Sequence, residues 1–355
     1  MKNLKSFFPS HDCLCKVDAE LYSVNQDIIT EEDINHLNLF LTPSSIIDGT
    51  NNELTPAILK HEHYRSFELP ERELLRDKQG GVYFTKRLKG NGLYSCPFAC
   101  WFHKRRNIMK DPTGLVLGLQ CKDDYDKSFK NSKILREMGI ETEIPMGAFI
   151  LREIVFSIEN EAKRMDIKKA FELAQLPSDY QNIEFVIRID AIGVNHRMLD
   201  FFNADSLFSE DFCSKEVVQD LMLKETELLL NYEMKLLNTS ITFDLENDLP
   251  SYLKFMTSRI MKNVAILHRN RGIHDQFTTQ NLTLDGKYID YDTLEWIPEK
   301  EDFEEKRISD MNKLTNSLTF FLKDILKEKK IAKGDDLTKT ILEEGNATYS
   351  QHLHS

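Results

Sequence analysis

Short runs of alternating apolar and polar residues predict strands in the first half of the chain. In residues 80–92 one face carries Val82, Phe84 and Leu88, and Lys89 lies on the opposite face near the end of the expected strand. Glycines follow Lys89, so we expect the strand to end there.

Two further strands are expected at residues 148–158 and 182–192. In the second, Ile187 and Ile189 would face a core, which leaves Arg188 on the other side of the strand.

Apolar residues at spacings of three and four predict helices in most of the remaining chain. A serine, Ser214, stands where a helix N-cap is expected, and Gly139 stands where a C-cap is expected. The expected helices cover residues 126–138, 214–237, 251–268 and 304–328.

These elements divide the chain into an irregular polar extension with a few short elements (1–79), a strand-rich lobe (80–205), a helical lobe (206–330) and a frayed polar tail (331–355). The expected fold class is α+β with two lobes. Ligands often bind where two such lobes meet.

Composition narrows the class of protein. Of the 355 residues, 41% are hydrophobic and 29% are charged, as in globular proteins, and the formal net charge is -12. Because phosphate backbones attract basic faces, this charge argues against a nucleic-acid partner. No apolar run of about 18 residues predicts a membrane span, and MKNLKSFFPSHDC lacks a secretory apolar stretch. We therefore expect a cytoplasmic protein without a membrane partner.

The six cysteines do not predict a disulfide framework in a chain of this length. Cys13 with Cys15, and Cys96 with Cys100, have spacings at which thiolates can hold zinc. Neither pair is accompanied by a second well-spaced Cys/His pair, which favours ordinary thiols.

The stretch QNLTLDGKYIDYD (280–292) predicts a hairpin with a two-residue turn at Asp285-Gly286. Counting outward from this turn places Asn281 opposite Asp290, with Cβ atoms about 4.5 to 5.5 Å apart. An amide oxygen and a carboxylate at that spacing suit Mg²⁺, which takes its other ligands from water and substrate phosphates. The alternative is that both residues simply end the hairpin, as Asn and Asp often do.

His274 lies seven residues before Asn281. The same spacing separates the His and the metal-binding Asn in the H-R-D-x-x-x-x-N motif of protein kinases.

Four segments, in the same order, resemble the selenoprotein-O (SelO, YdiU-like) family of protein adenylyltransferases. RLKGNGLYS (87–95) is similar to its L-K-G-x-G-x-x-x-Y-S segment, with one residue fewer before the tyrosine, and MGIETEIPMGAFI (138–150) is similar to L-G-I-P-T-T-R-A-L. FVIRIDAIGVNHRMLDFF (185–202) resembles M-R-V-A-P-S-H-L-R-F-G-x-F-E-x-F. HDQFTTQNLTLDGKYIDYD (274–292) resembles H-G-x-M-N-T-D-N-M-S-I-x-G-x-T-I-D-Y-G without a gap up to its Tyr. The shorter microcin-maturation relatives of the MchC type resemble the same segments.

The resemblance implies a protein-kinase-like fold that binds ATP and Mg²⁺ and transfers AMP to a protein or peptide. It assigns the ATP phosphates to Lys89, Arg188 and Arg197, although two extra residues separate the arginines here, and it assigns the metal to Asn281 and Asp290. Paired guanidinium bonds suit phosphate oxygens. An exposed strand lysine at position 89 and an ion pair of either arginine with a neighbouring acid remain alternatives, and for Arg188 that acid is Asp190.

The chain also departs from the family. Gln280 stands where the family has its expected proton acceptor, and Gln276 stands at the catalytic Asp position of kinases. An amide accepts no proton as a general base. Asp292 replaces a glycine and could act as an additional ligand or a displaced base. The family's G-D-G-R loop and the glutamate that pairs with Lys89 have no clear counterparts, and Asp126 is the nearest acid.

The leading hypothesis is ATP- and Mg²⁺-dependent nucleotidyl transfer. A carboxylate acceptor is already ionised at neutral pH and needs no base, which favours adenylation of a peptide carboxylate during peptide maturation. A partner enzyme would then supply the second half-reaction. The alternatives are a catalytically inactive, ATP-binding pseudokinase scaffold and a kinase that transfers the γ-phosphoryl group.

Overall fold

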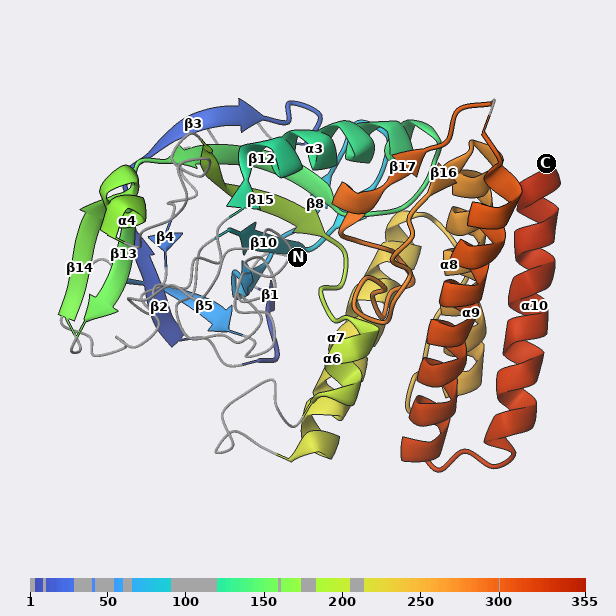
Figure 1. The fold of residues 1–355 in the computed structure, drawn as a ribbon. Coiled ribbons are helices and arrows are strands. Elements are labelled where there is room, and N and C mark those ends of the chain that lie inside the picture. Colours follow the sequence, from blue (N-terminus) through green and yellow to red (C-terminus); the bar gives the residue numbers. More distant parts are fainter. Residues whose placement is uncertain are drawn as a thin grey trace. The chain divides into compact units, whose positions relative to one another are not determined.

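A computed structural model describes residues 4–8, 11–28, 40–41, 54–59, 66–90, 120–158, 161–173, 183–204, 214–299 and 301–355. The described residues form a mixed α+β fold (Figure 1), which confirms the α+β part of the expected fold class. Cys96 and Cys100 lie outside the described residues, and Cys13 and Cys15 lie on strand β2 (His11–Lys16).

Contacts divide the chain into two compact units. The first comprises Met1–Phe129, Ile144–Ala191 and Ser206–Phe212, and the second comprises Lys130–Glu143, Ile192–Asp205 and Cys213–Ser355. The division therefore differs from the expected lobes, because two segments of the strand-rich half belong to the helical unit.

A nine-stranded sheet, counted over the described residues, forms the framework of the first unit. Its spatial order is β3-β12-β15-β10-β6-β5-β2-β4, and β11 pairs with β15. The remaining strands are β3 Ala19–Val24, β4 Phe40–Leu41, β5 Leu54–Leu59, β6 Ser66–Glu68, β10 Thr85–Lys89, β11 Gln120–Cys121, β12 Ile144–Leu151 and β15 Phe185–Ile192. Strands β2 to β6 all lie before residue 80, so the short elements expected in the extension include strands of the main sheet.

Among the described residues of the first unit, three smaller antiparallel ladders accompany this sheet. They pair β1 Leu4–Lys5 with β7 Glu71–Arg72, β8 Leu75–Arg76 with β9 Val82–Tyr83, and β13 Glu153–Ile158 with β14 Glu161–Asp166, which helix α4 (Ile167–Leu173) follows.

Two of the predicted strands are each divided between the main sheet and a ladder. Residues 80–92 contain β9 and β10, and residues 148–158 contain the end of β12 and all of β13. The second division has a visible cause, because the backbone N–H groups of Arg152 and Glu153 both donate to the carbonyl of Asp18, at 3.0 and 3.3 Å. This contact leads the chain out of the main sheet.

The third predicted strand, β15, is confirmed, but all eight of its residues are buried. Both faces of the strand are therefore covered, and Arg188 and Asp190 lie in the interior of the first unit.

The second unit is built on long helices, at the positions where the sequence predicts them. Helix α3 (Lys122–Glu137) crosses the boundary between the units and ends at Gly139, whose φ of 78° is the left-handed conformation of a C-cap. The unit also holds α6 Met198–Phe202, α7 Lys215–Leu236, α8 Leu249–Arg269 and α9 Phe303–Glu328. The apolar stripe predicted for α8 is buried along its length.

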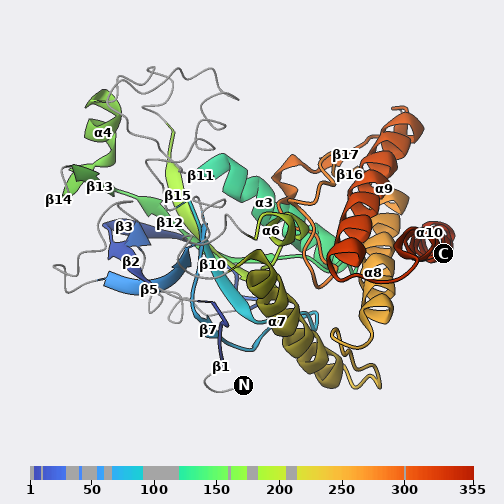
Figure 2. The same ribbon diagram turned by 90° about the horizontal axis from the view of Figure 1, so that it is seen from below.

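Residues 331–355 do not form a frayed tail. They form helix α10 (Gly334–His354), which packs against α8 and α9 (Figures 1 and 2). Ile341 and Tyr349 are buried in this contact. The expectation failed because small and polar residues, Thr338 and Gly345, occupy buried positions where an apolar stripe would normally mark the helix.

Gly345 allows α10 to approach α8 closely. A Cβ at this position would lie 2.9 Å from Cγ2 of Thr257 and 3.2 Å from Cγ of Met261. We expect Gly345→Ala to lower the free energy of unfolding in urea, because an overpacking cost of about 1–3 kcal/mol exceeds the gain in helix propensity of about 1 kcal/mol. Asn346→Ala is the matched control, since Asn346 is exposed on the same helix. Equal stabilisation by both substitutions would contradict this packing.

Candidate functional site

The hairpin of residues 280–292 exists, but its register differs by one residue from the prediction. Leu282 pairs with Tyr288, and Thr283 donates its backbone N–H to the carbonyl of Lys287 at 3.0 Å. The connection therefore has three residues, the last of which is Gly286 with a φ of 79°, as is typical of three-residue hairpin loops. The prediction that Asn281 lies opposite Asp290 is wrong.

Asn281 instead lies opposite Ile289, whose N–H donates to the Asn281 carbonyl at 3.0 Å. Its side-chain Nδ2 donates to the carbonyl of Gln276 at 3.1 Å, which fixes the orientation of the amide because the opposite orientation would bring two oxygens together. Its Oδ1 is buried and accepts no hydrogen bond within the described structure. Such an orphaned buried acceptor is rare and needs an explanation.

Asp290 is the residue after Ile289 and has a left-handed backbone, with φ 65° and ψ 53°. Non-glycine residues seldom adopt this conformation, although Asp tolerates it better than most, and it is concentrated at functional sites. The side chain is half-buried, as is that of Asp292 in the short 3₁₀ helix η2 (Tyr291–Thr293).

A third segment runs beside the hairpin. Thr142 pairs in parallel with Tyr288, and its Oγ1 donates to the Tyr288 carbonyl at 2.6 Å. The next residue, Glu143, is 1% exposed, and its Oε1 accepts the backbone N–H of Asp290 at 3.3 Å. The hydroxyl of Tyr291 donates to the Glu143 carbonyl at 2.8 Å.

Glu143 is a candidate site residue that sequence reasoning missed. Its segment follows the Gly139 cap and precedes β12, and nothing in the local pattern places it against the hairpin. The available signal was the two acids of Glu-Thr-Glu (141–143) directly before a buried strand, because acids are seldom buried unless they are paired or bind a ligand.

The loop before the hairpin is held by the carboxylate of Asp310 on α9. This carboxylate accepts the backbone N–H groups of His274 and Asp275 at 3.0 and 2.9 Å, and it lies 3.1 Å from Nε2 of His268. The other ring nitrogen of His268 lies 2.8 Å from the hydroxyl of Tyr349 on α10. Helix α10, which was not predicted from the sequence, is thus connected through His268 and Asp310 to the loop before the hairpin.

His274 is fully buried and stacks on Phe277, with ring centroids 4.7 Å apart. Burial lowers the pKa of His274 and outweighs the nearby carboxylates that raise it. Its neutral Nδ1 accepts the N–H of Gln276 at 3.3 Å. His274 therefore shapes the loop that carries Asn281.

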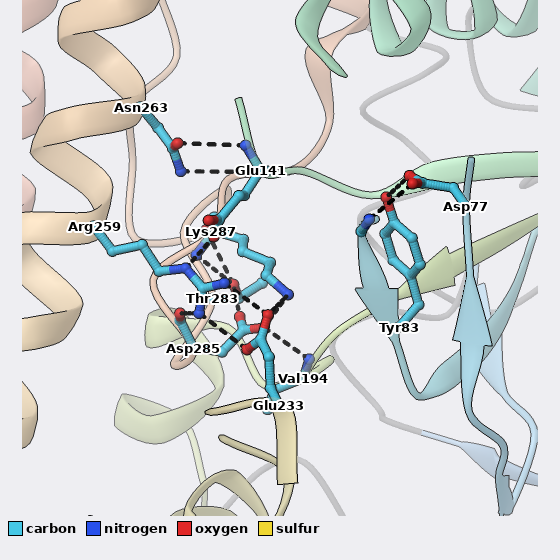
Figure 3. A network of polar contacts seen from close by, with 11 residues as sticks. Asp77, Tyr83, Glu141, Val194, Glu233, Arg259, Asn263, Thr283, Asp285 and Lys287 are labelled. Carbon is cyan, nitrogen blue, oxygen red and sulfur yellow. Dashed lines mark hydrogen bonds and ion pairs between the residues drawn. The ribbon is translucent and has the colours of Figure 1, made fainter. Parts of the chain in front are cut away.

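The turn of the hairpin lies in a buried ionic network (Figure 3). Glu233 on α7 accepts hydrogen bonds from Arg259 on α8, at 2.7 and 3.1 Å, and from Lys287 at 3.1 Å. Arg259 also pairs with Glu141 and donates to the carbonyl of Asp285 at 3.1 Å. The Asp285 carboxylate accepts the N–H of Val194 at 3.1 Å.

The electrostatics of this network favour its charged form. Burial alone would raise the pKa of Glu233, but Arg259 and Lys287 outweigh burial and lower it to about 2. Burial likewise opposes the charge on Lys287, but Glu233 and Asp285 outweigh burial and raise the pKa of Lys287.

The residues expected to hold phosphate are distributed over both units. Lys89 is half-buried at the end of β10 in the first unit. Arg188, on the neighbouring β15, pairs with Asp190 at 3.0 Å, and Arg87 reaches the same carboxylate oxygen at 2.9 Å. The ion pair considered as the alternative for Arg188 is therefore present.

Two further expected residues have other surroundings. Arg197 belongs to the second unit, where it is buried, pairs through its backbone with Thr283 and donates its N–H to Asp200 at 2.9 Å. Asp126, the nearest acid to the missing glutamate, is exposed and accepts a hydrogen bond from the hydroxyl of Tyr22.

Over the described ranges, no group of three or more His, Cys, Asp or Glu side chains could hold a metal ion. Asn281 and Asp290 nevertheless offer oxygen ligands, which Mg²⁺ prefers, and the orphaned Oδ1 of Asn281 is an acceptor without a donor. The chemistry of these two residues therefore fits Mg²⁺ that takes further ligands from elsewhere.

No family model matches the chain, and no curated protein matches its sequence. In the described part of the chain, none of the helices has the length and apolar character needed to cross a bilayer.

Glu233→Gln tests the ionic network. Because the folded pKa of about 2 lies below the ordinary value of 4.5, the charge of Glu233 stabilises the fold above pH 4.5, and this contribution is lost as the pH falls toward 2. We expect Glu233→Gln to lower the free energy of unfolding at pH 7 by about 3–5 kcal/mol, the usual cost of breaking a buried pair. The difference from the wild type should narrow in urea titrations at pH 3.

Glu246→Gln is the control, because Glu246 is exposed in the same unit. A wild-type advantage that stays constant from pH 7 to pH 3 would contradict the charged form of Glu233.

Proposed function

We propose that the protein transfers a nucleotidyl group from ATP, with Mg²⁺, to a protein or peptide acceptor by means of a kinase-like two-lobed fold. One observation carries the proposal. The two residues that the family resemblance assigns to the metal share one loop, where Asn281 has an orphaned buried oxygen and Asp290 has a strained left-handed backbone.

The chain's own residues would divide the work as follows. Asn281 and Asp290 would hold Mg²⁺. The resemblance assigns phosphate oxygens to Lys89, Arg188 and Arg197, of which Arg188 is already paired with the buried carboxylate of Asp190. Bound Mg²⁺ would supply charge stabilisation at the phosphates. An acceptor oxygen would form a bond to the α-phosphorus of ATP, and the bond to the bridging oxygen would break and release pyrophosphate.

The absence of a base at two positions shapes the choice of acceptor. Gln280 is exposed, and the backbone N–H and C=O of Gln276 are bonded to His274 and Asn281. Neither amide can take a proton from a hydroxyl acceptor. A peptide carboxylate is already ionised, so its adenylation, followed by ligation with a partner enzyme, agrees best with this loop. Asp292, which stands where the family has a glycine, is an acid of this loop that could serve a hydroxyl acceptor.

The same amides support a second candidate, a pseudokinase scaffold that binds ATP without turnover. A third candidate is γ-phosphoryl transfer with ATP in the usual kinase orientation.

Incubation with ATP labelled separately at the α and γ positions distinguishes the three functions. We expect α label on a protein or peptide product and release of pyrophosphate. Transfer of γ label would indicate a kinase. Mg-ATP binding without transfer of either label would indicate the scaffold, and the absence of both labels and of a thermal shift with Mg-ATP would refute all three.

Asp290→Asn tests the metal assignment. Asn keeps the size of the side chain and tolerates the left-handed backbone, whereas alanine would be strained at φ 65°. We expect Asp290→Asn to remove the contribution of Mg²⁺ to ATP binding, measured by calorimetry with and without Mg²⁺, because the charged ligand is lost.

Asp275→Asn is the matched control, since Asp275 also has a positive φ, 59°, in the same loop and pairs with Lys313. Unchanged Mg-ATP binding by Asp290→Asn would refute the assignment of Asp290.

A further inference from the structure

Three backbone segments of the second unit lie side by side at the hairpin. The central segment ends in Tyr288, Ile289 and Asp290. Asn281 pairs with Ile289 from one side, and the parallel pairing of Thr142 with Tyr288 brings Glu143 to the other side. Asn281, Asp290 and Glu143 therefore meet at the same end of this small sheet.

The contact between Glu143 and Asp290 places the Glu143 carboxylate against the backbone of an expected metal ligand. Oε1 of Glu143 is within hydrogen-bonding distance of the Asp290 backbone N–H, at 3.3 Å, and the Glu143 side chain is almost completely buried. A bound cation stabilises carboxylates that gather at one site.

The amide of Asn281 is an independent indication of a ligand. Asn281 is 4% exposed, and its Nδ2 is bonded to Gln276 while its Oδ1 has no donor in the described structure. Oxygen atoms of both carboxylates and amides coordinate hard cations. Glu143, Asp290 and Asn281 together provide that set of ligands.

We propose that Glu143 is the third protein ligand of the cation site, and that this site holds a hard divalent cation, Mg²⁺ or Mn²⁺, before any nucleotide binds. The inference rests on the proposed function for the roles of Asn281 and Asp290. Two ligands alone would leave the cation dependent on ATP phosphates, whereas three ligands with two charges hold it without ATP.

Electron paramagnetic resonance with Mn²⁺ alone tests this proposal, because free Mn²⁺ gives a six-line signal that decreases on binding. We expect the wild type to bind one Mn²⁺ without nucleotide. Glu143→Gln keeps an oxygen that can accept the Asp290 N–H but removes the charge. The variant therefore distinguishes two roles of Glu143, that of a metal ligand and that of a residue that only positions the backbone. We expect it to weaken Mn²⁺ binding roughly tenfold or more.

Glu227→Gln is the matched control. Glu227 lies on α7, and its carboxylate also accepts a backbone N–H, from Leu245 at 2.7 Å. This substitution should leave Mn²⁺ binding unchanged.

Two outcomes would overturn the proposal. In the first, Glu143→Gln binds Mn²⁺ as the wild type does, which would make Glu143 a backbone-positioning residue only. In the second, the wild type binds no Mn²⁺ without ATP, a result that does not require the variant to fold. Either outcome leaves the nucleotidyl-transfer proposal to be judged separately by the position of the label transferred from ATP.

Discussion

The buried ion cluster of Glu233, Arg259 and Lys287 is the interaction on which the second unit depends. It joins α7, α8 and the hairpin turn (Figure 3). Replacing such a cluster by apolar residues is often neutral or stabilising, so net stability does not explain why these charges are buried here. A one-residue slip of a strand sends each side chain to the opposite face. Such a slip would withdraw Lys287 from Glu233 and leave buried charges unpaired. The cluster therefore selects one register of the hairpin.

That register determines the geometry of the candidate site. It places Ile289 opposite Asn281, and Asp290 follows Ile289 in the left-handed conformation. From the other side, Asp310 holds the loop by the N–H groups of His274 and Asp275. A strained residue and an orphaned buried oxygen persist only where the surroundings fix them. Both ends of this loop are fixed, and that rigidity is what a preorganised ligand set requires.

Much of the secondary structure could be predicted from the sequence, because α7, α8 and α9 carry regular apolar stripes and α3 ends in a glycine. Helix α10 could not be predicted, since its contact with α8 uses Gly345 in place of a large apolar residue. The hairpin was predictable, but its register was not, because the register depends on charges from α7 and α8 that are distant in sequence. Glu143 was missed for the same reason. Its position beside Asp290 arises from a parallel pairing between segments about 150 residues apart.

The loop carries oxygen groups of the kind that suit a cation, and amides occupy the two positions where the family resemblance leads us to expect a base. Gln276 uses its backbone to hold His274 and Asn281, so this position contributes to the shape of the loop whichever side chain it carries. Gln280 is exposed. Transfer of a charged group depends mostly on positioning and on cations that stabilise developing charge. Under the proposed function, an acceptor that is already ionised removes the need for a base. Adenylation of a carboxylate yields a mixed anhydride, which a second nucleophile must attack to form a stable product. The absence of a base and the expectation of a partner enzyme are therefore two consequences of the same acceptor chemistry.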